Sequence, residues 1–91
     1  MDDKKKLLYL AVRARENLVF IGKVSSFTSY NDKGKFDVLP GHANFISLIN
    51  KSLLFKDLAG ESHEIKIGLG IMRVVKNNVE VYLGVEGLKG I

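Results

Sequence analysis

Apolar and polar positions alternate with a period of two along most of this chain. Such alternation, in short runs rich in β-branched and aromatic residues, predicts β-strands. Apolar residues occupy every second position from Leu8 to Ala14, and the same holds from Val79 to Leu83. Each of these two strands is therefore expected to bury one face and expose the other.

Turn residues divide the rest of the chain into further short runs. The expected strands cover residues 18–30, 35–39, 53–56, 61–67 and 71–75, with turns at 31–34, 57–60 and 76–78. Residues 43–55 fit either a helix or a strand, and the β-branched Ile46 and Ile49 favour short strands. At least seven short strands at about ten-residue spacing are typical of a β-sandwich or a small barrel.

Glycine, proline and asparagine mark the expected irregularities. Gly22 is expected to interrupt its strand with a bulge or a close backbone approach. Pro40-Gly41 suits the central positions of a type II turn, and Asn77-Asn78 suits the left-handed conformation of a tight hairpin. The glycines of segment 68–70 are expected where the chain crosses between strands at close range.

Composition narrows the protein class. A chain of 91 residues, 46% hydrophobic and 26% charged, has the balance of one small globular domain rather than of a disordered segment. The absence of cysteine excludes disulfides, thiolate metal ligands and a thiol nucleophile. No apolar run reaches the eighteen or so residues of a membrane-spanning helix. We interpret residues 1–6 as a charged tail.

The net charge of +4 is mild, and the lysines and arginines are scattered along the chain. One function compatible with it is a small β-barrel that binds single-stranded nucleic acid by stacking bases on aromatic side chains. The aromatic residues that suggest it are Tyr9, Phe27, Tyr30, Phe36 and Tyr82.

Residues able to carry chemistry are few. His42 follows a turn. It could act as a general base or a ligand, or it could simply hydrogen-bond a loop or a partner protein. No Ser, Asp or second His lies at a spacing that supports catalysis. His63 is expected to pair with a neighbouring carboxylate on an exposed strand face. A zinc site from His42, His63 and a glutamate has no supporting motif, so no metal site is predicted. Gly68-Leu69-Gly70 lacks the third glycine of a dinucleotide fingerprint.

Segment 34–43 ends in Pro40, Gly41, His42 and Ala43, and it resembles the most recognisable stretch of the epsilon subunit of F-type ATP synthases. Leu10 and Val12, followed by residues 20–24, are similar to that family's first two strands. Residues 68–74 are similar to its glycine-rich strand, and residues 78–81 to its final hairpin. The resemblance covers residues 7–85 and leaves 86–91 as a short C-terminal tail.

The resemblance implies an all-β fold, a flattened ten-stranded β-sandwich of two sheets. It further implies a non-catalytic central-stalk subunit that links the gamma subunit to the membrane c-ring during ATP synthesis coupled to ion transport. Such a subunit lies at the cytoplasmic face of the cell membrane, attached only through its partners. No cofactor and no nucleic-acid partner are expected.

The resemblance also assigns contact residues. The c-ring contact is expected at Asn31, Asp32, Lys33, Gly34 and Lys35, and the gamma-subunit contact at Ala14, His42, Phe45 and Ser47. Lys33 and Lys35 replace residues that are usually acidic, which implies either an acidic ring loop or lysines that point elsewhere. Asp37 replaces a small residue, and Asn44 stands where a proline is common.

Family members commonly continue into a two-helix hairpin that inhibits ATP hydrolysis and, in some bacteria, holds ATP. This sequence ends at Ile91. The expectation is therefore a protein without the C-terminal helical domain and without ATP binding.

Overall fold

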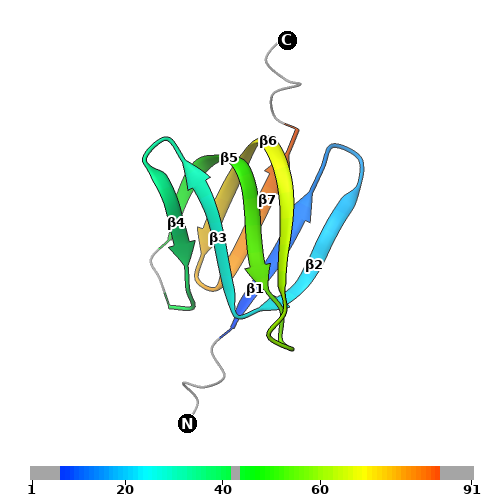
Figure 1. Ribbon diagram of the computed structural model, residues 1–91, viewed down its shortest axis with the longest axis vertical. Helices are drawn as coiled ribbons and strands as arrows, with labels where there is room; N and C mark the ends of the chain where they lie inside the picture. Colours follow the sequence, from blue (N-terminus) through cyan, green and yellow to red (C-terminus); the bar gives the residue numbers. More distant parts are fainter. Residues whose placement is uncertain (1–6, 42–43, 85–91) are drawn as a thin grey trace.

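The computed structural model describes residues 7–41 and 44–84. Its strands are β1 (Leu8–Arg13), β2 (Leu18–Val24), β3 (Ser26–Asn31), β4 (Gly34–Val38), β5 (Phe45–Lys56), β6 (Ser62–Val75) and β7 (Asn78–Leu83). They form one mixed sheet in the order β2-β1-β7-β6-β5-β3-β4, in which only β1 and β7 pair in parallel (Figure 1). The described residues contain no helix, and the expected all-β class is confirmed.

Several sequence-based expectations lie outside the described residues. These are the two tails, residues 1–6 and 86–91, together with His42 and Ala43. Within the ranges 7–41 and 44–84, no helix has the length and apolar character needed to cross a membrane.

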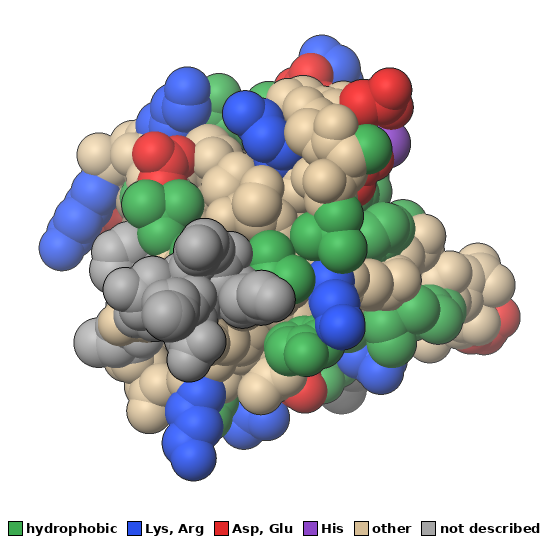
Figure 2. All heavy atoms as spheres, turned by 90° about the horizontal axis from the view of Figure 1, so that it is seen from below, with side chains coloured by type: hydrophobic (Ala, Val, Ile, Leu, Met, Phe, Trp, Pro, Cys, Tyr) green, Lys and Arg blue, Asp and Glu red, His purple; other side chains and the backbone are tan. Residues whose placement is uncertain are grey.

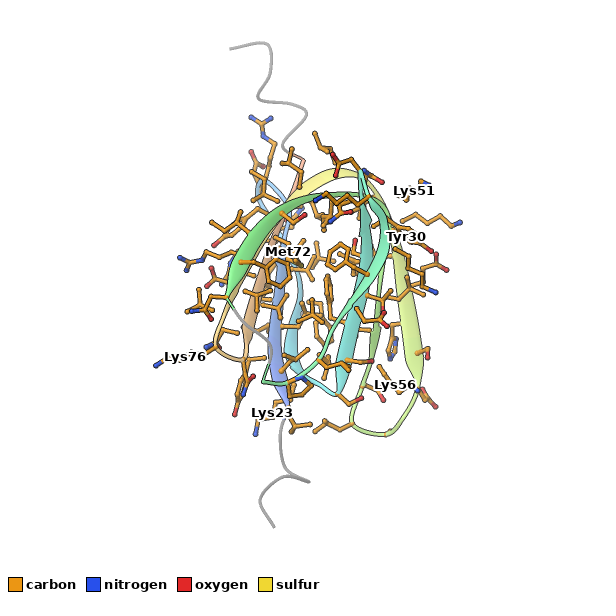
Figure 3. The ribbon with its side chains drawn as sticks, turned by 90° about the vertical axis from the view of Figure 1, so that its left-hand side faces the viewer. Lys23, Tyr30, Lys51, Lys56, Met72 and Lys76 are labelled. Carbon is orange, nitrogen blue, oxygen red and sulfur yellow. The ribbon has the colours of Figure 1, made fainter. Side chains whose placement is uncertain are left out.

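The single sheet folds over on itself into two layers (Figures 1 and 3). Strands β5 and β6, with 12 and 14 residues, are the longest pair, and both bend over the top of the molecule as drawn. The early part of β5 and the late part of β6 lie in one layer with β1, β2 and β7. The other halves lie with β3 and β4 in the second layer. The sandwich is therefore built without a break in hydrogen bonding between its layers.

A bulge accompanies the bend. In the β5–β6 pairing, Lys51 stands alone between two paired residues, whereas Ile67 and Gly68 both occupy the corresponding gap in β6. Lys51 has a φ of 72°, a left-handed conformation that few non-glycine residues adopt. The buried Ser29 hydroxyl donates a 2.8 Å hydrogen bond to the Ser52 carbonyl oxygen beside the bulge. This bond satisfies a backbone acceptor where the regular ladder is interrupted.

The core fills the space between the two layers. Met72, labelled in Figure 3, is fully buried there. The side chains on the inward faces of β1 and β7 are also buried, as the alternation of apolar and polar residues predicts. The buried apolar set is Leu8, Leu10, Val12, Val24, Phe27, Val38, Ile49, Leu53, Phe55, Met72, Val74, Val79 and Val81. Ile65 and Ile67 are partly buried and pack against it.

The expectation was ten strands in two sheets, whereas the described residues form seven strands in one sheet. The physical reason is that β5 and β6 pass from layer to layer as continuous strands. Residues 43–55 were expected as short strands, but residues 45–56 form one long strand. The glycines of segment 68–70 likewise lie inside β6 rather than at a crossing between strands.

Two other local expectations need correction. Gly22 does not interrupt β2; it pairs with Leu10, and the chain leaves the strand three residues later, at Ser25. In the β6–β7 turn the left-handed residue is Lys76, with a φ of 57°, rather than an asparagine. The type II turn is supported, because Gly41 has the positive φ, 89°, that its third position requires.

Candidate interaction surfaces

The hairpin between β3 and β4 carries the residues expected to face the c-ring. The Lys33 N–H donates to the Asn31 side-chain oxygen at 2.8 Å, and Gly34 has a φ of 116°. Asp32, Lys33, Gly34 and Lys35 are all exposed. The sequence-predicted turn is thus a projecting tip that is fixed by a local hydrogen bond and carries charges of both signs.

Phe45 and Ser47, expected to face the gamma subunit, lie on the side of β5 that faces the second layer. The ring of Phe45 packs edge to face against Phe36, with centroids 6.3 Å apart. Ser47 Oγ accepts a 3.3 Å hydrogen bond from Asn31 Nδ2. The structure therefore brings together Asn31 and Ser47, which the resemblance assigned to two different contacts.

Ala14 lies apart from this pair, where β1 ends. Its N–H donates to the Asn17 carbonyl oxygen at 2.8 Å and closes the β1–β2 turn. In Figure 1 this turn and the β3–β4 turn lie at the same end of the sandwich, on opposite sides. The described gamma-contact residues consequently do not form one cluster.

The β6–β7 turn holds the chain on both sides of segment 42–43. The Gly41 N–H donates to Asn77 Oδ1 at 2.9 Å, and the Lys76 N–H donates to Asn44 Oδ1 at 2.7 Å. Asn44, which departs from the family pattern, thus satisfies the backbone of the left-handed Lys76. Asp37, a further departure, accepts a 2.7 Å hydrogen bond from Thr28 Oγ1 on the neighbouring strand.

An apolar row that the sequence pattern did not predict lies on the outer face of the layer that contains β1, β2 and β7. Ile71 pairs with Leu48 on one side and with Tyr82 on the other, and all three side chains are exposed. We call these three residues the outer apolar row. Ile46 lies beside the row on β5 and is 69% exposed. One feature of the sequence indicates this row, namely that β5 carries apolar residues on both of its faces.

A shallow hollow continues this face across β1 and β2. Its volume is about 430 Å³, and it lies where Ala11 offers little side chain between the larger Tyr9 and Ile21. The face therefore carries the outer apolar row beside the Arg73–Glu80 ion pair, and it is not flat. Contiguous exposed apolar surface of this kind typically marks a protein contact.

Charged side chains, unlike the residues of the outer apolar row, do not form a continuous patch on the face shown in Figure 2. Figure 2 shows Lys and Arg side chains standing apart from one another around the lower face, while hydrophobic side chains gather on one half of it. A protein that tracks a nucleic-acid backbone requires a continuous basic groove. The face in Figure 2 has no such continuous groove among the described residues.

The second histidine pairs with a carboxylate, but the partner is Asp57 in the hairpin turn rather than a neighbour on the strand face. His63 Nε2 lies 2.8 Å from Asp57 Oδ2, across the β5–β6 hairpin. The hydrogen bond from His63, reinforced by the backbone N–H groups of Glu61 and Ala59, lowers the pKa of Asp57 below its usual value. These contacts favour the ionised form of Asp57.

A sandwich with a projecting turn fixed by a hydrogen bond and an exposed apolar face has the features of a small protein-binding β-domain. Residues 7–84 match the family described as the β-sandwich domain of the ATP synthase delta/epsilon chain, and this chain belongs to that family. The resemblance carried by segment 34–43 is thereby confirmed.

The relatives carry the same family name. The chain is 32% identical over 77 residues to the ATP synthase epsilon chain of Wolinella succinogenes, covering 84% of this chain and 59% of that one. It is 35% identical over 71 residues to that of a Nitratiruptor species, covering 77% and 55%. The chain thus spans only a little over half the length of these two relatives.

Solved structures agree on the fold. A chain of the Euglena gracilis mitochondrial ATP synthase superimposes with a TM-score of 0.80 at 17% identity, covering 86% of this chain and 51% of that one. A chain of the Tetrahymena thermophila mitochondrial ATP synthase gives 0.69 at 11% identity, covering 84% and 62%. These matches favour the β-sandwich and give no support to the nucleic-acid-binding barrel.

Proposed function

We propose that this chain is a non-catalytic central-stalk subunit of an F-type ATP synthase, which links the gamma subunit to the c-ring in ATP synthesis coupled to ion transport. The family match over residues 7–84 is the observation that carries the proposal. Its relatives are ATP synthase epsilon chains, and the solved assemblies that contain similar chains include the c-ring.

The ring contact is assigned to the tip of the β3–β4 hairpin, residues Asn31, Asp32, Lys33, Gly34 and Lys35. A contact with polar loops needs a projecting element whose charges are held in place, and the Asn31–Lys33 hydrogen bond supplies one. Since two lysines flank Gly34, the complementary ring loop in this synthase is expected to offer carboxylates. Asp32 supplies the one acidic group of the tip.

The gamma contact is assigned to Ala14, His42, Phe45 and Ser47, extended onto the outer apolar row. Ile46 and Leu48 alternate with Phe45 and Ser47 on β5 and point to the opposite face. Full burial of one such aliphatic side chain contributes on the order of 2 kcal/mol. A partner that covers this face therefore gains most of its binding free energy from Ile46 and Leu48, which the resemblance does not assign to the contact.

The continuous sheet suits the transmission of torque. Force applied at the β3–β4 tip reaches the opposite layer through β5 and β6, which cross between the layers without a break. Close packing of the core between the layers resists deformation. The membrane association follows from the complex, and the subunit lies peripherally on the cytoplasmic face of the cell membrane.

Co-purification with the gamma subunit of the same organism tests the proposal. The wild-type chain is expected to elute with gamma, whereas the double substitution Ile46→Asp and Leu48→Asp is expected to abolish co-elution. Leu58→Asp is the matched control, because Leu58 is equally exposed, at 60%, but lies on the β5–β6 hairpin. Failure of the wild-type chain to bind gamma, together with salt-sensitive binding of single-stranded DNA, would instead favour the nucleic-acid-binding barrel.

A further inference from the structure

A cluster of three metal-ligating side chains lies at the hairpin between β5 and β6, at the opposite end of the sandwich from the β3–β4 turn (Figure 1). Asp57, Glu61 and His63 each offer one ligand atom, and the three atoms lie within 4.8 Å of one another. One imidazole nitrogen with carboxylate oxygens suits Zn²⁺ and neighbouring transition metals, whereas Ca²⁺ and Mg²⁺ prefer oxygen ligands alone. We propose that this hairpin binds one Zn²⁺-class divalent ion through Asp57, Glu61 and His63.

The turn itself fixes the two carboxylate residues. Asp57 Oδ1 accepts hydrogen bonds from the N–H groups of Ala59, at 2.9 Å, and Glu61, at 3.0 Å. The Asp57 N–H in turn donates to the Glu61 carbonyl oxygen at 2.9 Å. Because Oδ1 is occupied by backbone donors, Oδ2 is the oxygen left for an ion. The Asp57 carboxylate, held in this way, loses little conformational entropy when it binds an ion.

An aromatic neighbour fixes the imidazole. The ring of His63 stacks on Phe55, with centroids 5.1 Å apart and planes 19° from parallel. Its Nε2 lies 2.8 Å from Asp57 Oδ2. Two such ligands on a tetrahedral zinc ion are roughly 3.4 Å apart, given its bond lengths. The pair needs to open by only about half an ångström for an ion to replace the proton that the two groups share.

The site is open to solvent. The side chains of His63 and Asp57 are 45% and 30% exposed, and Glu61 is exposed as well. An ion held by these three groups keeps a fourth position for water or for a side chain of a partner. No sequence motif marks this site, because its ligands come together across a turn, with Asp57 and Glu61 four residues apart and His63 two further.

Titration of the full chain with ZnCl₂ alone, after treatment with EDTA and dialysis, tests the proposal. Calorimetry is expected to give one equivalent, and the NMR ring signals of His63 are expected to move while those of His42 stay. His63→Gln and Glu61→Gln are each expected to weaken binding at least ~10-fold, since loss of even an outer-shell partner costs about that much. The NMR arm needs no variant and does not depend on variant folding.

The matched controls are His42→Gln and Glu64→Gln, which remove the other histidine and a carboxylate adjacent to His63 but outside the cluster. Both are expected to bind Zn²⁺ as the wild-type chain does. No binding by the wild-type chain, binding that survives either His63→Gln or Glu61→Gln, or an equal loss in a control variant would overturn the proposal. None of these results bears on the stalk function, which is tested by binding to gamma.

Discussion

Asn31 Nδ2 donates a hydrogen bond to Ser47 Oγ at 3.3 Å and so joins the tip of the β3–β4 hairpin to the start of β5. Asn31 belongs to the proposed ring contact and Ser47 to the proposed gamma contact. The two contacts are therefore mechanically connected by one side-chain bond as well as by the sheet. A load on the hairpin tip reaches the layer that carries the outer apolar row by a short route.

This bond predicts a coupled pair of substitutions. Ser47→Ala removes the acceptor, and Asn31→Asp removes the donor while keeping the oxygen that accepts from the Lys33 N–H. Each substitution is expected to lower the free energy of unfolding by about 1 kcal/mol. In chemical denaturation the double variant should lose much less than the sum of the two single losses. Strict additivity would show that the bond contributes nothing.

Gly70 predicts a packing limit between β6 and β7. A Cβ there would lie 3.1 Å from the Tyr82 carbonyl oxygen and 3.1 Å from a Leu83 methyl group. Gly70→Ala is therefore expected to cost about 1–3 kcal/mol of stability. Gly22→Ala is the control, because its Cβ would meet only the end of the Phe20 ring, which is able to shift. Equal melting temperatures for the two variants would contradict this packing.

The two sides of β6 predict opposite sensitivities at adjacent positions. Met72 is fully buried between the layers, whereas Ile71 faces outward in the outer apolar row. Met72→Ala is expected to destabilise the isolated chain by about 2–5 kcal/mol. Ile71→Ala is expected to change stability by less than about 1 kcal/mol and to weaken binding to gamma. A large loss of stability with Ile71→Ala would mean that this face is not free in the isolated chain.

The side-chain oxygen of Asn77, in the β6–β7 turn, is expected to hold the chain at Gly41 in place. Asn77→Ala removes the acceptor for the Gly41 N–H, and Asn77→Asp retains it. We expect Asn77→Ala to cost about 1 kcal/mol and to weaken gamma binding through the displaced chain around His42. Asn77→Asp should behave like the wild-type chain in both measurements. If all three proteins bind gamma with the same affinity, the turn does not contribute to the gamma contact.

The local features of the fold are those that the sequence predicts well. The period-two pattern identifies the buried faces of β1 and β7 because alternation alone decides which side chains point inward. Pro40-Gly41 and the turn at residues 31–34 are predictable because glycine with a positive φ has few local alternatives.

Features that depend on distant pairing are not predictable in this way. A long strand that bends resembles two short strands in sequence, so the passage of β5 and β6 between the layers is visible only when Lys51 is seen opposite Ile67 and Gly68. The Asn31–Ser47 bond joins residues 16 apart, and the outer apolar row unites three strands. No local pattern contains these relationships, and the resemblance supplied only part of the candidate contact.

Site-specific cross-linking in the assembled synthase tests the proposed link between gamma and the ring, since this chain has no cysteine and each introduced thiol is unique within it. With a photoreactive maleimide, Asp32→Cys should cross-link to the c-ring and Leu48→Cys to gamma, while Leu58→Cys should reach neither. A chain that incorporates into the complex but gives no c-ring product from position 32 and no gamma product from position 48 would contradict the proposed link between gamma and the ring.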